Sequence, residues 1–291
     1  MIHRMFRAGL ALACFLWAIS FIATKIALEA VPPLTLVSLR LAVSGACFFP
    51  WFVRRWGRIR SGGFWRLLAL SLVGTALHHG TQTVGLQLTS ASNASLYAAT
   101  CPVCIALIAA VLLKERITHR KAAGILLALV GVLVVLGLGT LRSLDFRTHL
   151  LGDALVFASI FLWSVFTVCG KSVGSRIGPF ELIGAATVLG AILSAPMGLV
   201  EMGSRGFSLL SVPARAWAAI LFLGVTCGFL ANLLYFLALD KLETGKVGVY
   251  LYTIPPMTYA AEGMILGERM GPNLWVGSYL VLAGVYLTER G

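Results

Sequence analysis

Long apolar runs follow one another along the whole chain and are separated by short polar or charged connections. The runs are continuous over about 20 residues, whereas the strands of a membrane β-barrel alternate over about 10 residues. A helix of about 20 apolar residues crosses about 30 Å of hydrocarbon at a rise of about 1.5 Å per residue. The pattern therefore predicts an all-α membrane protein. The ten predicted transmembrane helices cover residues 7–29, 33–53, 66–87, 93–113, 120–138, 152–172, 178–199, 216–239, 245–266 and 272–289.

The composition agrees with lipid as the solvent of this chain. Of its 291 residues, 59% are hydrophobic and 12% are charged, against about 25% charged residues in an ordinary soluble domain. The mean hydropathy is +0.92. The first run follows Arg4 and Arg7, is too long for the apolar part of a signal peptide and carries Lys25, so we expect it to be retained as the first span. Pro33, Pro179 and Pro272 mark predicted helix starts, where the missing N–H costs no hydrogen bond.

The net charge of +12 predicts the orientation of the chain. Lys and Arg concentrate in the cytoplasmic connections of membrane proteins. With the N-terminus inside, 16 of the 23 basic residues fall at inner ends and 5 at outer ends, while Lys25 and Arg40 lie within spans. We therefore expect a multi-pass protein of the bacterial inner membrane with both termini in the cytoplasm, and no binding of nucleic acid.

The second half of the chain repeats the first. A first set of residues recurs at a constant shift of 146: Phe15, Leu16, Trp17, Lys25 and Pro33 return as Phe161, Leu162, Trp163, Lys171 and Pro179. A second set recurs at a shift of 153: Tyr97, Pro102, Glu115 and Arg116 return as Tyr250, Pro255, Glu268 and Arg269. Because each copy holds an odd number of helices, the second would enter the membrane from the opposite side. We expect two five-helix domains, residues 1–145 and 146–291, forming an inverted repeat with a substrate site near the midplane.

Several of these motifs together resemble the EamA-type drug/metabolite transporters. The resemblance covers nearly the whole chain. It rests on the motifs Trp17-x3-Phe21-x3-Lys25 and Pro33-x6-Arg40, and on Pro102 and Pro255, each of which precedes a Glu-Arg pair. It implies a ten-helix, five-plus-five architecture and the export of small metabolites. Within the superfamily, the chain is most similar to the YddG-type exporters of aromatic and other neutral amino acids. It departs from the family at Ala18, where many members have Gly after the Trp. It also lacks a second Arg, since Ala186 is the counterpart of Arg40.

Aromatic and polar side chains inside the spans are candidates for a solute cavity. Trp prefers the membrane interface, so Trp17 and Trp163 in the middle of their spans indicate either a lined cavity or helix–helix packing. His79 and Gln82 share one face of the third span, where they would bind the backbone of an amino acid or bond to other helices. The complete set of predicted substrate-binding residues is Trp17, Phe21, His79, Gln82, Tyr97, Trp163, Asn232, Tyr235 and Tyr250.

Charges and prolines within the spans are candidates for gating. An ionisable residue inside a membrane is costly, and Arg40 has the planar fork that binds a carboxylate, either that of a solute or that of Glu262 in a pair that closes the outer side. Pro102 and Pro255 would kink helices at matched depth, either as gates or as fixed bends. The predicted gating or charge set is Lys25, Arg40, Pro102, Pro255 and Glu262. The Glu-Arg pairs at 115–116 and 268–269 should form ion pairs that fix helix ends.

Other functional classes find little support in the sequence. There is no HExxH motif and no GxxxxGK[ST] phosphate loop, so we expect no enzyme, no metal and no cofactor. Cys101 and Cys104 have redox spacing but fall inside an apolar run, which favours a structural role. The leading hypothesis is a secondary transporter that exports small neutral metabolites by alternating access, most of all aromatic and other neutral amino acids.

One alternative is an exporter of drug-like or cationic solutes of the multidrug type, with or without proton coupling. That alternative is disfavoured because it would need a carboxylate in the middle of the membrane to exchange protons for cations, and the candidate Glu262 lies toward an outer end. The expected partners are a small-molecule solute and membrane lipid. A monomer suffices, because one chain holds both halves.

Overall fold

The computed structural model describes residues 2–61, 63–89, 97–142, 150–266 and 271–291; for residues 2–4, 21, 137–142 and 262–266 it describes the backbone only. Over these ranges the chain forms helices and no strands. The elements are α1 (Ile2–Leu28), α2 (Pro33–Arg54), α3 (Trp56–Ser61), α4 (Phe64–Ser71), η1 (Leu72–Leu77), α5 (His78–Leu88), α7 (Cys101–Leu112), α8 (His119–Arg142), α9 (Leu150–Ile177), α10 (Pro179–Arg205), η2 (Leu209–Ser211), α11 (Ala214–Phe222), η3 (Leu223–Ala231), α12 (Asn232–Lys241), α13 (Thr244–Val249), η4 (Tyr250–Thr253), α14 (Ile254–Leu266) and α15 (Pro272–Glu289).

Helix lies within every range predicted for a span, and the all-α class is confirmed. The helix starts predicted at Pro33, Pro179 and Pro272 are confirmed as well. Within the described residues, 6 helical runs are long and apolar enough to cross a membrane. They are Met5–Leu28, Pro33–Arg54, His119–Leu136, Leu150–Ile177, Pro179–Arg205 and Ala214–Lys241.

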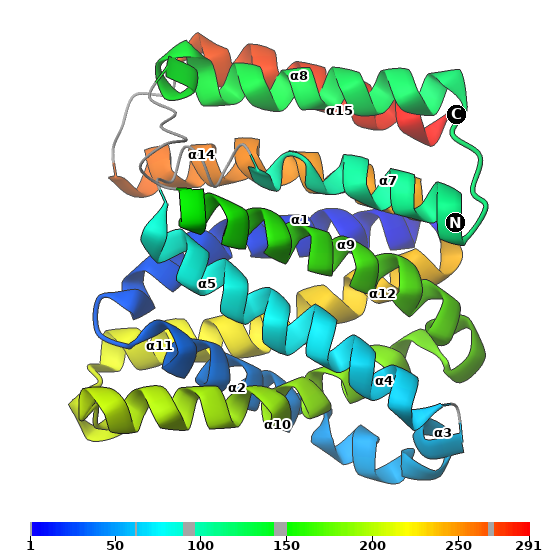
Figure 1. Cartoon of the computed structure of the whole chain (residues 1–291). Helices are drawn as coiled ribbons and strands as arrows, with labels where there is room; N and C mark the ends of the chain where they lie inside the picture. The colour runs from blue at the N-terminus through cyan, green and yellow to red at the C-terminus, as the bar shows by residue number, and fades with distance from the viewer. Residues whose placement is uncertain (1, 62, 90–96, 143–149, 267–270) are drawn as a thin grey trace.

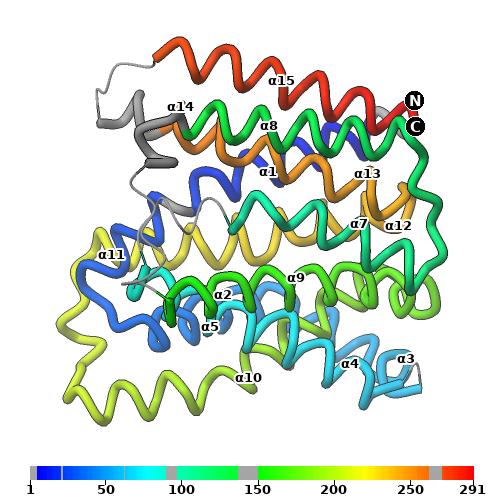
Figure 2. The backbone as a smooth tube through the Cα atoms, turned by 45° about the horizontal axis from the view of Figure 1, so that its top comes forward, coloured from blue at the N-terminus to red at the C-terminus, as the bar shows by residue number. Residues whose placement is uncertain are grey.

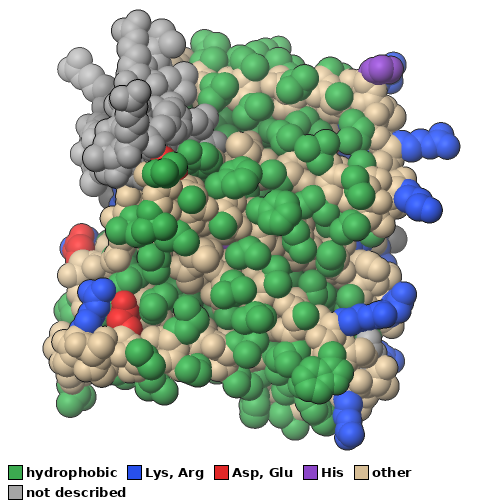
Figure 3. Space-filling view, in the orientation of Figure 1, with side chains coloured by type: hydrophobic (Ala, Val, Ile, Leu, Met, Phe, Trp, Pro, Cys, Tyr) green, Lys and Arg blue, Asp and Glu red, His purple; other side chains and the backbone are tan. Residues whose placement is uncertain are grey.

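The helices lie roughly side by side, and successive helices run back and forth between the two ends of the bundle (Figure 1). Both termini lie at one end, on the right in Figure 1, together with α3 and the connection from α7 to α8. Lys and Arg side chains gather at this end, while hydrophobic side chains cover the middle of the visible face (Figure 3). We call it the basic end and the opposite one the far end. This distribution is the one expected for a membrane protein with an apolar belt.

Helices α8 and α15 lie side by side at one edge of the bundle in both views, with α10 toward the opposite edge (Figure 1 and Figure 2). Their backbones approach closely at glycines. A Cβ on Gly124 would lie 2.6 Å from the carbonyl oxygen of Gly284, and one on Gly284 would lie 2.5 Å from that of Gly124. Gly131 and Gly277 are reciprocal in the same way, at 2.8 and 2.6 Å. Small residues allow this packing, which supplies the attraction between helices in lipid.

The remaining helices pair across the middle of the chain. Helix α2 packs along α10, α5 along α9, and α1 along α11, η3 and α12. The hydrophobic core accordingly mixes residues from both halves: Leu10 and Phe48 lie in one cluster with Phe166 and Ile183. The two other clusters are mixed as well. Residues 1–145 and 146–291 are therefore interlocked.

Helices α9 and α10 each continue five or six residues beyond their predicted ends. Helix α9 continues to Ile177, and the predicted end at 172 is wrong because Lys171 is not the polar boundary of the helix. Its ammonium donates to the carbonyl oxygen of Leu242 at 2.6 Å and contacts Glu115. Helix α10 continues to Arg205, beyond the predicted end at 199. Glu201 in this extension is buried and accepts hydrogen bonds from the N–H and hydroxyl of Thr35, at 2.8 and 3.0 Å.

Candidate functional site

Three aromatic rings meet where α1, α9 and α12 approach one another. The rings of Trp17 and Trp163 lie 5.7 Å apart at an interplanar angle of 90°, an edge-to-face contact. The ring of Tyr235 lies 5.2 Å from Trp17 and 5.8 Å from Trp163. Such contacts contribute about 0.5–1.5 kcal/mol beyond the burial of their area. Because the two indoles touch, no solute-sized space separates them in this conformation. We call these three residues the aromatic cluster.

The two adjacent histidines of α5 have different surroundings. His78 is buried, its Nδ1 lies 2.8 Å from the carbonyl oxygen of Ser159, and its ring lies 5.2 Å from Trp163. His79 is half-buried, and its Nδ1 is enclosed without a hydrogen-bond partner among the described residues. Gln82 is half-buried one turn further along the helix. His78 thus fastens α5 to α9, whereas His79 keeps its polar atom available.

Arg40 of α2 lies beside the same region. Its side chain is half-buried, and its guanidinium forms no ion pair or hydrogen bond within the part of the chain that the structure describes. It interacts electrostatically with His78, His79 and Cys227. Its carbonyl accepts a hydrogen bond at 2.8 Å from Ser44, whose hydroxyl also lies 2.9 Å from the carbonyl oxygen of Gly224. Arg40 therefore stands at the crossing of α2 and η3.

Two π-helical stretches lead into these polar residues, which the sequence analysis missed. Stretch η1 ends directly before His78, and η3 ends directly before Asn232. π-Helical turns within α-helices occur frequently at functional sites. Both stretches contain Gly and Thr in an otherwise apolar run, which is the only local signal for them. A Cβ on Gly74 in η1 would lie 2.0 Å from the Phe166 ring, so glycine is needed there.

Other predicted substrate-binding residues have hydrogen-bond or ring partners of their own. The Asn232 amide donates to the carbonyl oxygen of Gly228 in its own helix at 3.0 Å. Tyr97 packs its ring 6.1 Å from Phe157. Tyr250 donates its hydroxyl to Glu289 at 2.6 Å. The structure therefore gathers Trp17, Trp163 and Tyr235 with His78 and His79, whereas the hydroxyl of Tyr250 is bonded to Glu289.

The predicted gating residues have mixed surroundings. Pro102 is the second residue of α7, which begins after a turn at 99–100. Pro255 is the second residue of α14, which begins after the 3-10 helix η4. The breaks precede the prolines, at corresponding positions of the two halves. Lys25 is exposed on α1. The side chains of Phe21 and Glu262, and the whole of Glu268 and Arg269, lie outside the described residues.

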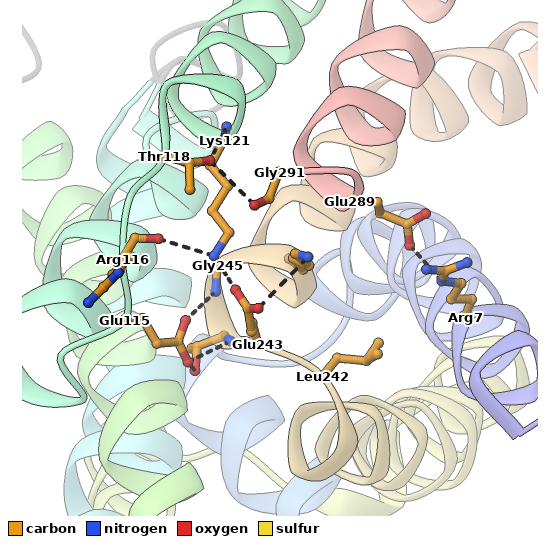
Figure 4. A network of polar contacts seen from close by, with 12 residues as sticks. Arg7, Glu115, Arg116, Thr118, Lys121, Leu242, Glu243, Gly245, Glu289 and Gly291 are labelled. Carbon is orange, nitrogen blue, oxygen red and sulfur yellow. Dashed lines mark hydrogen bonds and ion pairs between the residues drawn. The ribbon is translucent and has the colours of Figure 1, made fainter.

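A polar network closes the basic end of the bundle (Figure 4). The Glu115 carboxylate accepts hydrogen bonds from the N–H and hydroxyl of Thr244, at 2.9 and 2.7 Å, and from the N–H of Gly245 at 3.2 Å. The Lys171 ammonium lies 3.2 Å away. Burial alone would raise the pKa of the Glu115 carboxyl, but these donors and the ammonium outweigh it, so the pKa lies below its ordinary value. Glu115 therefore forms an ion pair, but its partner is Lys171 of α9 and not the neighbouring Arg116.

Further contacts extend this network between the two halves. Lys121 pairs with Glu243 and donates to the carbonyl oxygen of Arg116 at 3.1 Å. Arg7 pairs with Glu289 at 2.9 Å, the carboxylate that also accepts the hydroxyl of Tyr250. Each of these side-chain ion pairs joins a residue before 146 to one after it. We call the set Arg7, Glu115, Lys121, Lys171, Glu243, Thr244 and Glu289 the basic-end network.

No group suited to a metal ion occurs among the residues that the structure describes. All six cysteines are unbridged, and Cys101 contacts the Ser164 hydroxyl at 3.7 Å. Gly170, Ser172 and Gly174 match the letters of the hydrolase motif GxSxG. They lie inside α9, however, and not at the strand-to-helix turn that exposes a nucleophile.

Comparison with known proteins identifies relatives over the whole length. The model of the EamA-like transporter family matches residues 8–137 and again residues 150–290. An uncharacterized transporter of Archaeoglobus fulgidus is 32% identical over 282 residues, covering 96% of this chain and 95% of that protein. The uncharacterized transporter YvbV of Bacillus subtilis is 25% identical, covering 96% of this chain and 90% of that protein.

Two further comparisons concern function and fold. A probable terminal-alkyne amino-acid exporter of Streptantibioticus cattleyicolor is 26% identical, covering 97% of this chain and 92% of that protein. A solved crystal structure superposes with a TM-score of 0.80 at 22% identity, covering 96% of this chain and 95% of that chain. That likeness concerns the fold alone.

Proposed function

The chain belongs to the EamA-like transporter family, and from that premise we propose that it exports small neutral metabolites by alternating access, with aromatic and other neutral amino acids as the leading class. It is a multi-pass membrane protein, and its relatives are named as transporters, not as enzymes. The observation that carries the proposal is the contact between Trp17 and Trp163. These residues correspond in the two halves and meet near the middle of α1 and α9.

The proposed architecture has ten spans in two oppositely oriented halves, 1–145 and 146–291. Support comes from helix contacts that survive an exchange of the halves. Helix α2 packs against its counterpart α10, and α8 packs against its counterpart α15. Helix α5 packs against α9, and their counterparts in the other half, α12 and α1, pack against each other in the same way. The reciprocal approach of Gly124 and Gly284 has the same symmetry. The concentration of Lys and Arg at the basic end supports a cytoplasmic location of that end in a bacterial inner membrane.

In this proposal the described conformation is closed toward the cytoplasm. The basic-end network joins the two halves through three ion pairs, and the contact between Trp17 and Trp163 leaves no gap between these indoles near the middle of the bundle. Loading of a solute from the cytoplasm then requires these ion pairs to separate and the indoles to move apart. Before the solute is released on the opposite side, the ion pairs must form again. The two halves exchange conformations in this cycle, as in other inverted-repeat carriers.

The proposed solute class follows from the groups around the aromatic cluster. Indole and phenol rings stack on aromatic or apolar side chains, and His79 and Gln82 offer polar atoms to an amino and a carboxyl group. One relative is named as a probable amino-acid exporter, which agrees with this class. Neutral amino acids combine the apolar and polar parts that such a site would bind.

Counterflow in proteoliposomes tests the proposal. Purified protein is reconstituted in vesicles preloaded with one unlabelled amino acid, and uptake of labelled Phe, Trp, Leu and Ala is measured with and without an imposed pH gradient. We expect saturable uptake that is highest for aromatic amino acids and needs no pH gradient. Uptake of lipophilic cations driven by a pH gradient, with none of the amino acids carried, would instead establish the multidrug alternative.

A further inference from the structure

Arg40 is an unusual residue for the interior of a membrane protein. Its side chain is half-buried in helix α2, and none of the described residues neutralises its guanidinium. An unpaired charge surrounded by protein in a membrane is costly, and such residues pair with another group or serve a function. Within the described part of the chain this guanidinium has no partner, so a negative charge on another molecule would neutralise it.

The described surroundings of Arg40 are neutral or basic. The described titratable groups that interact electrostatically with it are His78 and His79 on α5 and the thiol of Cys227 on η3. The hydroxyl of Thr226 lies 3.4 Å from the Cys227 sulfur and donates to the carbonyl oxygen of Phe222 in its own helical run at 2.6 Å. A guanidinium beside two imidazoles attracts anions and repels cations.

Three neighbours of Arg40 connect it to the aromatic cluster. The Cys227 thiol, which interacts with Arg40, donates to the carbonyl oxygen of Leu16 at 3.4 Å, directly before Trp17. The two histidines connect Arg40 to Trp163. The ring of His79 lies 4.7 Å from that of His78, and the ring of His78 lies 5.2 Å from that of Trp163. A small molecule with one anionic group and one apolar group would reach both Arg40 and the indoles.

The charge occurs in one half only. The residue at the corresponding position of α10 is Ala186, which is completely buried and packs in the core. A symmetric pair of halves would accept a solute in two equivalent orientations. A single guanidinium removes that equivalence, because the anionic end of the solute is attracted to one side.

From these observations, and resting on the proposed function, we infer that Arg40 is the residue that binds the carboxylate of the transported solute. The cargo then carries a free carboxylate, which the planar fork of Arg40 binds through two N–H donors, while its apolar part lies toward Trp17 and Trp163. Amides and decarboxylated amines, which have the same apolar part but a net positive charge, are rejected by the same guanidinium.

Counterflow with a matched series of solutes tests this inference. The series is phenylalanine, phenylalaninamide and phenethylamine, carried by the wild-type protein and by the variants Arg40→Met, Arg40→Lys and Arg60→Met. Arg60 is exposed at the basic end and serves as the control for loss of one positive charge. We expect the wild type and Arg60→Met to prefer the acid to the amide by about ten- to one-hundredfold, the ratio typical of a charge-assisted hydrogen bond.

In Arg40→Met, uptake of phenylalanine should fall by a similar factor and the preference over the amide should approach one, with partial recovery in Arg40→Lys. Unchanged preference in Arg40→Met would overturn the inference and leave the proposed function intact. If Arg40→Met does not fold, the wild-type series decides, because equal uptake of acid and amide contradicts the inference. A wild-type protein that carries no amino acid at all would overturn both.

Discussion

The carboxylate of Glu115 accepts hydrogen bonds from both the N–H and the hydroxyl of Thr244, 129 residues later in the chain. Glu115 lies on the connection between α7 and α8, and Thr244 is the first residue of α13. The carboxylate thus occupies the start of a helix, where free N–H groups and the helix dipole favour negative charge. This contact joins the two halves of the chain at the basic end.

Removing the Glu115 carboxylate should loosen the basic end. In Glu115→Ala the N–H groups of Thr244 and Gly245 lose their acceptor, and Lys171 loses its counter-ion. We expect amide exchange at these two residues to accelerate by about tenfold or more, the effect of losing a charge-assisted bond. Hydrogen exchange followed by mass spectrometry in detergent measures it. Glu29→Gln, at an exposed position directly after α1, removes one negative charge as a control. Equal exchange in both variants would contradict a closing role.

The same contact should have a characteristic pH dependence. Because the pKa of Glu115 lies below its ordinary value of 4.5, the carboxylate stabilises the folded state above that value and loses this contribution as the pH falls through the lowered pKa. Protection of the Thr244 amide, corrected for intrinsic exchange, should therefore be constant from pH 7 to pH 5 and decline only below about pH 4.5. The decline should be absent in Glu115→Gln. A fall in protection between pH 7 and pH 5 would assign the contact to another titrating group.

The spans were predictable because a run of about 20 apolar residues is a local property of the sequence. The ends of α9 and α10 were not, since Lys171 and Glu201 continue inside helices only because distant partners, Glu115 and Thr35, neutralise or bind them. The same limitation applies to Tyr250. Its counterpart relation to Tyr97 indicated a cavity, but its bond to Glu289 depends on packing that no local pattern encodes.

The aromatic cluster was predictable in its members but not in its contacts. The shift of 146 between Trp17 and Trp163 identifies both indoles, and the choice between cavity lining and helix packing remained open from sequence alone. In the described conformation they pack against each other. The π-helical turns before His78 and Asn232 were not predictable, because π-helical hydrogen bonding has no distinct period in the apolar pattern.

Truncation of Trp163 or His79 should impair the transport of aromatic solutes. Trp163→Ala removes the partner of Trp17, Tyr235 and His78, and His79→Ala removes the unpartnered Nδ1. We expect both variants to insert in the membrane but to reduce counterflow of phenylalanine about threefold to tenfold, as the loss of one aromatic contact predicts. Trp275→Ala is the control, since that indole is 67% exposed on α15. Counterflow at the wild-type rate in both Trp163→Ala and His79→Ala would show that the solute binds to other helix faces.

A methyl group at the closest helix crossing should destabilise the protein. A Cβ on Gly284 would lie 2.5 Å from the carbonyl oxygen of Gly124, so Gly284→Ala must push α8 and α15 apart. The free energy of unfolding should fall by about 1–3 kcal/mol, the range for overpacking. Unfolding in detergent with increasing denaturant measures it. Gly203→Ala in α10 is the matched control, because nothing lies within 4 Å of the added atom. Equal stability of the two variants would contradict this close approach.

The proposed orientation can be tested at two exposed positions at opposite ends of the bundle. Arg116 is exposed at the basic end, and Leu210 in η2 is 97% exposed between α10 and α11 at the far end. Single cysteines at these positions, on a background without the six native cysteines, are treated in intact cells with a membrane-impermeant maleimide. We expect Leu210→Cys to be labelled at once and Arg116→Cys only after the cells are permeabilised, because basic connections stay in the cytoplasm. Labelling of both from outside would place the two ends on one face of the membrane, and the two halves could not then be inverted relative to each other.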